Sequence, residues 1–153
     1  MNLDRYIPIL KYDEIENFVL AELNIHIDLL KSMSRMQEIV LARKYISYFC
    51  LELTDLSQKK IGEFISKGDR KYDHSTVHYG WKRIKELIDN DKQTRFQVES
   101  IFINILKFVE YKKSLKRLAY LCDMEINNGN DYGDEIKGLS DKVYNYEQIH
   151  YPI

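Results

Sequence analysis

The stretch Asp73-His74-Ser75-Thr76-Val77 and the earlier stretch Leu56-Ser57-Gln58-Lys59-Lys60-Ile61-Gly62 decide the fold of this chain. Asp, Ser and Thr are preferred at helix N-caps, so the first stretch predicts a helix that begins at Asp73 or Ser75. Its opening residues are short and polar, with basic residues nearby, which suits a DNA groove better than a protein core. Apolar residues at helical spacing define one inward face of this helix. These are Val77, Trp81, Ile84 and Ile88.

The residues before these two stretches predict further helices. A first helix is expected to begin with Asp13 as N-cap and to run toward Leu30. The run Ser34-Arg35-Met36-Gln37 has the capping-box pattern, with Ser at the N-cap and Gln three residues later, and predicts the start of a second helix. Ser57 is expected to cap a short third helix.

The residues after Gly62 predict a loop, long helices and a tail. Residues 66–72 have turn chemistry and no apolar period, so they are expected to form a loop. Residues 94–121 are apolar and periodic and predict one long helix or two. Residues 123–153 hold seven acidic residues and two lysines, and predict an acidic, partly flexible tail with a short helix near residues 141–148. The fold class is all-α.

The charge is unevenly distributed along the 153 residues, whose formal net charge is −1. Residues 1–30 carry two Lys or Arg against six Asp or Glu, whereas residues 31–90 carry twelve against eight. Because local field matters more than total charge when a surface meets phosphates, the basic middle segment is compatible with a nucleic-acid partner.

The chain carries no features of a secreted or membrane protein. Its two cysteines, Cys50 and Cys122, lie in apolar surroundings and are expected to be reduced thiols. The first residues lack the pattern of a signal peptide, and no apolar run approaches the length that crosses a bilayer. We therefore expect a cytoplasmic protein with no membrane contact.

The helices predicted to begin at Ser57 and at Asp73 have the order of a helix-turn-helix. In this motif the second helix inserts its N-terminal residues into the major groove of DNA. His74, Ser75 and Thr76 are able to hydrogen-bond base edges there. Asp73 is able to accept a hydrogen bond from a cytosine amino group, or to cap the helix, and the sequence leaves both open. Basic residues around the helix starts would neutralise phosphates. They are Lys59, Lys60, Lys67, Arg70, Lys71, Lys82 and Arg83.

These stretches resemble the C-terminal DNA-binding domain of DnaA, the bacterial chromosomal replication initiator, over about residues 13 to 100. That family carries a Ser-x-x-x-Ile-Gly stretch, then Asp-His-Thr-Thr-Val, then a basic-Ile pair, here Arg83-Ile84. The resemblance implies a helix-turn-helix bundle of the Trp-repressor and DnaA C-terminal type, with additional C-terminal helices. It implies that Asp73, His74 and Ser75 read bases and that Thr76 contacts the backbone.

The same resemblance assigns further contacts with DNA. Arg35 matches the family's minor-groove arginine, and Arg43 matches a groove-facing arginine, followed here by Lys44. Gln58 and Lys59 fall where the family's first helix of the motif meets phosphates. The candidate DNA-binding residues are Arg35, Arg43, Lys44, Gln58, Lys59, Lys60, Arg70, Lys71, Asp73, His74, Ser75, Thr76, His78 and Lys82.

The sequence also departs from the family. The segment between Gly62 and Asp73 is longer, and Tyr72 stands where the family has arginine before Asp-His. No Gly-x-x-x-x-Gly-Lys-Ser/Thr loop occurs in the 153 residues, so we expect no nucleotide-driven ATPase. His74 and His78 have the spacing of a zinc-ligand pair, but Ser75 replaces the metalloprotease Glu and no third ligand is evident, so neither metal nor cofactor is expected.

The sequence therefore predicts a sequence-selective double-stranded DNA-binding protein without catalytic activity, a regulator or accessory replication factor. Three segments are expected: a helix-turn-helix domain at residues 1–100, a helix packed on it at 101–122, and the tail at 123–153. Two alternatives remain open. The signature could be a capped surface helix, and the protein could be an interaction module that lost DNA binding and forms a homodimer or binds a partner through its C-terminal helix.

Overall fold

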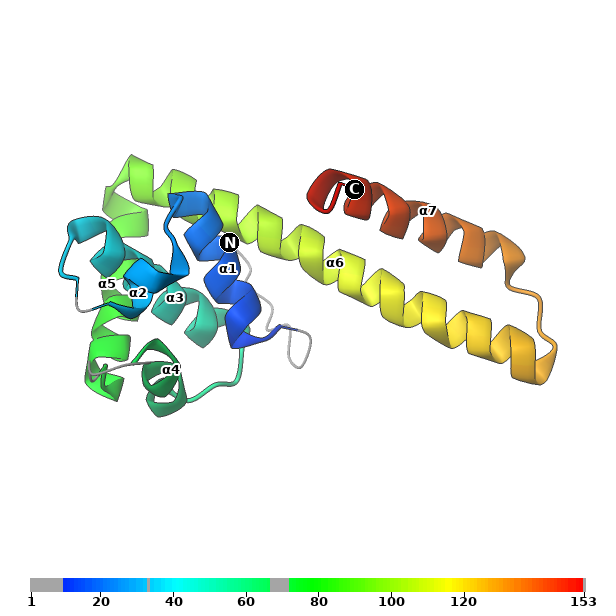
Figure 1. The fold of residues 1–153 in the computed structure, drawn as a ribbon, viewed down its shortest axis with the longest axis horizontal. Coiled ribbons are helices and arrows are strands. Elements are labelled where there is room, and N and C mark those ends of the chain that lie inside the picture. The colour runs from blue at the N-terminus through cyan, green and yellow to red at the C-terminus, as the bar shows by residue number, and fades with distance from the viewer. Residues whose placement is uncertain (1–9, 33, 67–71, 153) are drawn as a thin grey trace. The chain divides into compact units, whose positions relative to one another are not determined.

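The computed structural model describes residues 10–32, 34–66 and 72–152 of the chain (Figure 1). The described residues form helices and no strands, so the prediction of an all-α fold is confirmed. The helices are α1 (Tyr12–Leu23), α2 (Ile27–Lys31), α3 (Gln37–Leu53), α4 (Gln58–Ile65), α5 (His74–Asn90), α6 (Lys92–Asn128) and α7 (Gly133–His150).

The chain divides into two compact units, residues 1–105 and residues 106–153, and α6 contributes to both. In the N-terminal unit α3 is the central helix and contacts α1, α2, α4 and α5. Its buried side chains include Tyr45, Phe49 and Leu53, each with no exposed surface. The beginning of α6 joins this core, where Tyr45 Oη donates to Gln97 Oε1 at 2.6 Å.

The first helix is shorter than the sequence predicts. Asn24 takes the left-handed conformation with φ of 53°, which Asn tolerates better than most residues, and it ends α1. The expected helix from Asp13 to Leu30 is therefore wrong: α1 begins after Lys11, and α2 is a separate turn. The capping box at Ser34 is also wrong, because α3 begins two residues later than predicted, after Met36.

A partly buried ion pair joins three of the helices in the N-terminal unit. Lys31 of α2 lies 2.7 Å from Glu16 of α1, and its ammonium group also donates to the Phe64 carbonyl of α4 at 3.2 Å. The ring of Tyr12 stacks on that of Phe64, with centroids 4.7 Å apart. These contacts place α4 against α1 and α2.

The turn between α4 and α5 is closed at its two ends by Ser66. Its hydroxyl accepts from the Tyr72 N–H at 2.6 Å and lies 2.6 Å from the Gly62 carbonyl oxygen. The Tyr72 carbonyl lies so close to Gly62 that a Cβ there would overlap it. Both caps predicted for these helices are confirmed: Ser57 accepts from the Lys60 N–H, and Asp73 accepts from the Thr76 N–H.

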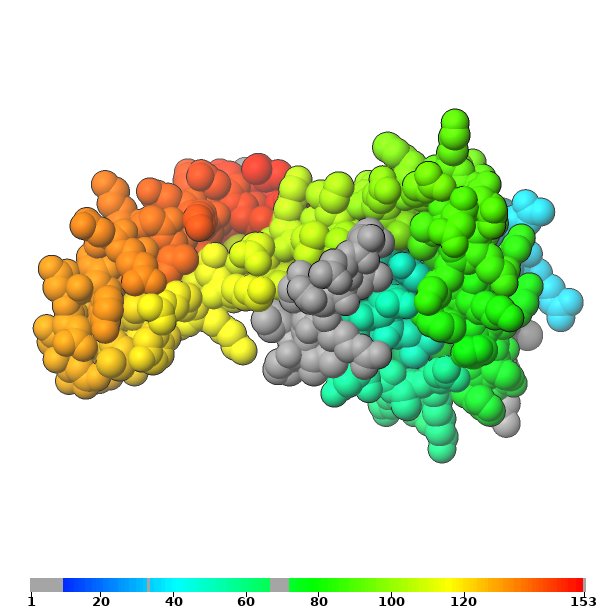
Figure 2. All heavy atoms as spheres, turned by 180° about the vertical axis from the view of Figure 1, so that it is seen from behind, coloured from blue at the N-terminus to red at the C-terminus, as the bar shows by residue number. Residues whose placement is uncertain are grey.

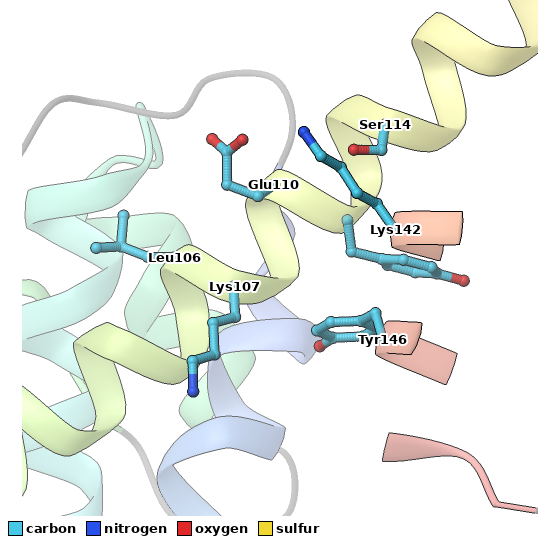
Figure 3. A pocket seen from close by; sticks show the side chains of 7 residues that line it. Leu106, Lys107, Glu110, Ser114, Lys142 and Tyr146 are labelled. Carbon is cyan, nitrogen blue, oxygen red and sulfur yellow. The ribbon is translucent and has the colours of Figure 1, made fainter. Parts of the chain in front are cut away.

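In the C-terminal unit, α6 and α7 run antiparallel as a helical hairpin (Figure 1). The ring of Tyr111 stacks on that of Tyr146 at 4.4 Å, and the side chain of Val143 is buried. A hollow on one side of this hairpin is lined by residues that include Lys107, Ser114 and Lys142 (Figure 3). The tail was expected to hold a short helix near residues 141–148; α7 is longer, at 18 residues.

The close approach at Gly62 predicts that Gly62→Ala destabilises the protein. A methyl group there would collide with the Tyr72 carbonyl, and overpacking of this kind costs about 1–3 kcal/mol. Gly138→Ala is the matched control, because nothing lies within 4 Å of a Cβ at Gly138 and alanine is favoured inside a helix. Urea denaturation of both variants checks this; equal stabilities for the two would contradict it.

Candidate nucleic-acid interface

The N-terminus of α5 is exposed, and the helix is anchored by the residues that follow. Asp73, His74, Ser75 and Thr76 are all exposed, whereas Val77 is fully buried. In Figure 2 the atoms of α5 are green and form a continuous part of the visible surface. Val77 and Ile84 of the predicted inward face are buried, while Trp81 and Ile88 are half-buried. The polar start of α5 is therefore exposed, on a helix that its buried residues hold in place.

Asp73 organises the side chains at this helix start. Its Oδ1 accepts three hydrogen bonds, from Ser75 Oγ at 2.9 Å, from Thr76 N at 2.8 Å and from Thr76 Oγ1 at 2.8 Å. These bonds stabilise the carboxylate and lower its pKa to about 2, with the two bonds from Thr76 as the largest causes. The capping role that the sequence left open is thus present in the structure.

This cap fixes the hydrogen-bonding character of the two hydroxyls. A hydroxyl has one proton, and in Ser75 and Thr76 that proton points to Asp73. Each oxygen keeps lone pairs that are able to accept from an incoming group. While the cap is intact, these side chains are acceptors toward a partner, and His74 is the neighbour whose ring remains able to donate.

The N-terminus of α4 lies beside α5. Gln58 Nε2 lies 3.3 Å from His78 Nδ1, and the His78 ring lies 5.4 Å from that of Trp81. Lys59 and Lys60 are exposed at the same helix start, where Lys60 forms an ion pair of 3.5 Å with its helix neighbour Glu63. The backbone N–H groups and lysines at this end form a surface that is able to hold phosphate.

Three further candidates, Arg35, Lys44 and Lys82, are exposed or half-buried. Arg35 is exposed just before α3, and Lys82 is exposed on α5. Lys44 is half-buried, with its ammonium 5.5 Å from the centre of the Tyr79 ring of α5. Gly80 makes this crossing possible, because a Cβ there would lie 3.3 Å from the Lys44 Cα. Of the remaining candidates, Arg70 and Lys71 lie outside the described residues, as does Lys67.

Arg43 is not a groove-facing residue, so this prediction is corrected. Its side chain is only 2% exposed. The guanidinium donates to the carbonyl oxygens of Leu30 at 2.8 Å, Ser32 at 2.6 Å and Ser34 at 2.9 Å. Arg43 therefore binds the backbone that connects α2 to α3, immediately before Arg35, and stabilises the fold rather than contacting a partner.

Three residues that position the site were missed by sequence reasoning: Ser66, Tyr72 and Gly80. Tyr72 was noted only as the residue that replaces an arginine, yet it is 7% exposed and closes the turn onto α4. Its apolar ring after a polar stretch was the available indication of burial. Ser66 and Gly80 gave no comparable indication, because their roles depend on contacts with other helices.

A second hollow lies beside the exposed face of α5. Its lining includes Tyr48, Trp81 and Lys85, with the Lys85 ammonium 4.5 Å from the centre of the Trp81 ring. Trp81 Nε1 donates to Glu52 Oε1 at 2.7 Å, which joins α5 to α3. Trp81 therefore packs between helices, as the apolar spacing of α5 predicts. Within the described ranges no three His, Cys, Asp or Glu side chains gather as metal ligands.

None of the helices in the described part of the chain combines the length and the apolar character needed to cross a membrane.

The arrangement of α4, the turn and α5 is that of a helix-turn-helix, a DNA-binding class of domain. Residues 12–84 match the family described as bacterial dnaA protein helix-turn-helix. These residues are a DnaA-type helix-turn-helix domain, and the resemblance predicted from the sequence is confirmed.

Two relatives show how far this likeness extends. The chromosomal replication initiator protein DnaA of Streptococcus pyogenes serotype M4 (strain MGAS10750) is 34% identical over 93 residues, which are 61% of this chain and 20% of that protein. The protein of the same name from Streptococcus agalactiae serotype Ia is 34% identical over 95 residues, 62% of this chain and again 20% of the relative. The match thus spans about a fifth of the length of these relatives.

The lowered pKa of Asp73 predicts an acid-dependent loss of stability. Its folded pKa of about 2 lies below the ordinary value of 3.8, so the stabilisation is present above pH 4 and is lost as the pH falls toward 2. Asp73→Asn keeps a capping oxygen that does not titrate. The variant should therefore lose less stability than the wild type between pH 5 and pH 2, as measured by thermal unfolding at each pH.

Asp91 caps the start of α6, and hydrogen bonds from Thr94 also lower its pKa, so part of the acid sensitivity should persist in Asp73→Asn. Identical pH dependence in the variant and the wild type would contradict the cap at Asp73.

The burial of Arg43 predicts opposite outcomes for two arginines of one segment. Arg43→Met leaves three carbonyl groups without their donor and should lower the free energy of unfolding by about 2–4 kcal/mol. Arg35→Met is the matched control, because Arg35 is exposed, and should change it by less than about 0.5 kcal/mol. Chemical denaturation compares them; a stable Arg43→Met protein would show that these bonds are dispensable.

Proposed function

We propose that this protein binds double-stranded DNA in a sequence-selective way, with the N-terminus of α5 in the major groove. The observation that carries this proposal is the exposed polar start of α5, held beside the N-terminus of α4 by Gln58 and His78. A helix end with short polar side chains is able to approach base edges that a helix flank would not reach.

In this proposal one group of residues contacts the DNA backbone and a second group discriminates bases. Lys59, Lys60 and the backbone N–H groups that begin α4 contact phosphates and set the register of the helix on the duplex. His74, Ser75 and Thr76 discriminate bases. Because Asp73 holds the protons of Ser75 and Thr76, these two accept hydrogen bonds from base amino groups, and His74 supplies the donor.

Arg35, Lys44 and Lys82 extend the contact in this proposal. Arg35 precedes α3 as an exposed side chain, and its length suits insertion into a minor groove. Lys44 and Lys82 add positive charge beside α5, and Arg70 and Lys71 belong to the same set by sequence. Counterion release from these contacts gives affinity, and the start of α5 gives selectivity.

At the level of the whole protein, we infer a regulator or accessory replication factor that acts through DNA binding. The relatives are named replication initiators, and the matched region is their helix-turn-helix. The proposal includes no catalytic step, cofactor or metal.

The second candidate is a protein-interaction module that kept this fold and lost DNA binding. Exposed apolar side chains on α6 favour it, since Leu115 is 37% and Tyr120 52% exposed. Such a module would bind a protein partner or a second copy through α6 and would give no salt-dependent DNA affinity.

Fluorescence anisotropy with short duplexes at several salt concentrations tests the proposal. His74→Ala should reduce the preference for the best duplex over random duplex by about tenfold, because a base contact carries selectivity. Lys59→Ala should weaken binding to all duplexes alike and reduce the salt slope by about 1. Lys137→Ala, an exposed lysine of α7, is the matched control and should change neither.

If the wild-type protein binds no duplex at low salt, DNA binding is excluded and the interaction module is favoured. If His74→Ala weakens binding to all duplexes equally, the assignment of His74 as a base reader is wrong.

A further inference from the structure

The hairpin of α6 and α7 carries an apolar stripe that α7 does not cover. Leu115, Ala119, Cys122 and Ile126 follow one another at intervals of four, three and four, so they share one face of α6. Leu115 is 37% and Ile126 82% exposed, and Ala119 is exposed as well. We refer to these four residues as the α6 stripe.

The stripe lies beside the α6 residues that line the hollow of Figure 3. Lys107, Ser114 and Lys142 line that hollow. An α-helix turns about 100° per residue, so Leu115 lies about 100° around α6 from Ser114, one turn after Tyr111, which stacks on Tyr146 of α7. Leu115, Ala119 and Ile126 are exposed beside this α7-facing surface, and Cys122 is half-buried at its edge.

Charge is strongly segregated along the hairpin. Residues 106–117 carry five Lys or Arg and one Glu, whereas residues 123–135 carry five Asp or Glu and no Lys or Arg. The end of the hairpin near its connecting turn is thus acidic, and the first part of α6 is basic. Lys116 of the basic segment and Asp123 of the acidic segment lie at the edge of the stripe, two helical turns apart along α6.

We propose that a second copy of this chain covers the α6 stripe, with the two α6 helices antiparallel and crossing at Ala119. In this arrangement Lys116 of each copy lies level with Asp123 of the other, and the basic part of one hairpin lies beside the acidic end of its partner. A parallel pair would place like charges level with each other, which is unfavourable.

The stripe is self-complementary in this arrangement. The midpoint between Lys116 and Asp123 falls beside Ala119, between positions 119 and 120, so a two-fold axis there satisfies both charge pairs at once. Its small side chain lets the two helices approach, while Leu115 and Cys122 pack on either side of the axis. A partner of a different sequence would need its own acidic and basic residues at the positions that face Lys116 and Asp123. A second copy carries them already, so the charge pattern favours a second copy as the occupant.

A charge-swap series on the full chain tests the pairing. Lys116→Asp and Asp123→Lys each place like charges opposite one another and should weaken the dimer about 5- to 10-fold in sedimentation equilibrium. The double variant Lys116→Asp with Asp123→Lys restores opposite charges and should return to the wild-type dissociation constant. Because both side chains are exposed, circular dichroism should show unchanged helix content in all three variants.

Disulfide trapping tests the position of the axis. Ala119→Cys in a Cys122→Ser background should form a disulfide-linked dimer under mild oxidation, because residues at a two-fold axis face their own copies. Tyr120→Cys in the same background is the matched control, since residue 120 lies on a different face of α6 and should remain a monomer on the gel. Cys50 is fully buried and remains in every variant.

A monomeric wild-type chain at about 100 μM would overturn the proposal, since specific dimers of this kind bind in or below the micromolar range. Failure of the double swap to restore the wild-type constant, or equal trapping at residues 119 and 120, would overturn the antiparallel arrangement. These readouts use no DNA, so their failure is separate from any failure of DNA binding.

Discussion

The close contact between Gly62 of α4 and the Tyr72 carbonyl is the constraint on which the helix-turn-helix depends. It places the chain that enters α5 directly against α4, so the position of the first turn of α5 follows from the packing of α4. Ser66 ties the same two points by hydrogen bonds, and the ion pair of Lys31 with Glu16 holds α4 through the Phe64 carbonyl. A longer turn between the helices is tolerated because its ends are fixed.

The carboxylate of Asp73 determines both where α5 starts and which hydrogen bonds its first side chains are able to form. Asp73 starts α5 and at the same time occupies the hydroxyl protons of Ser75 and Thr76. A base-reading surface needs a defined pattern of donors and acceptors, because an unmatched polar group costs free energy in a desolvated interface. The cap supplies such a pattern before any partner arrives. In the proposed complex with DNA, this cap would make an acidic residue compatible with a surface that approaches phosphates, because its charge is committed to the helix start.

Structural features that depend on neighbouring residues were predicted well from the sequence. Features that depend on contacts between distant residues were not. Ser57 and Asp73 were predicted as caps because capping depends on residues within one turn, and Val77 and Ile84 as core because their spacing is helical. Asn24 ended α1 early through a left-handed conformation that no apolar pattern reports. Arg43 was assigned to a groove from motif position alone, whereas its burial depends on three carbonyl groups that the fold brings to it. The full length of α7 was missed because much of its stability comes from pairing with α6.

The near-zero net charge of the chain conceals two separate arrangements of charge. Around α4 and α5, exposed lysines surround the helix starts. In the hairpin, residues 106–117 are basic and residues 123–135 are acidic. In the proposed dimer, antiparallel pairing of two hairpins would place each acidic segment beside a basic segment of the partner. Because these two arrangements cancel in the total, the net charge of −1 describes neither the helix starts of α4 and α5 nor the hairpin.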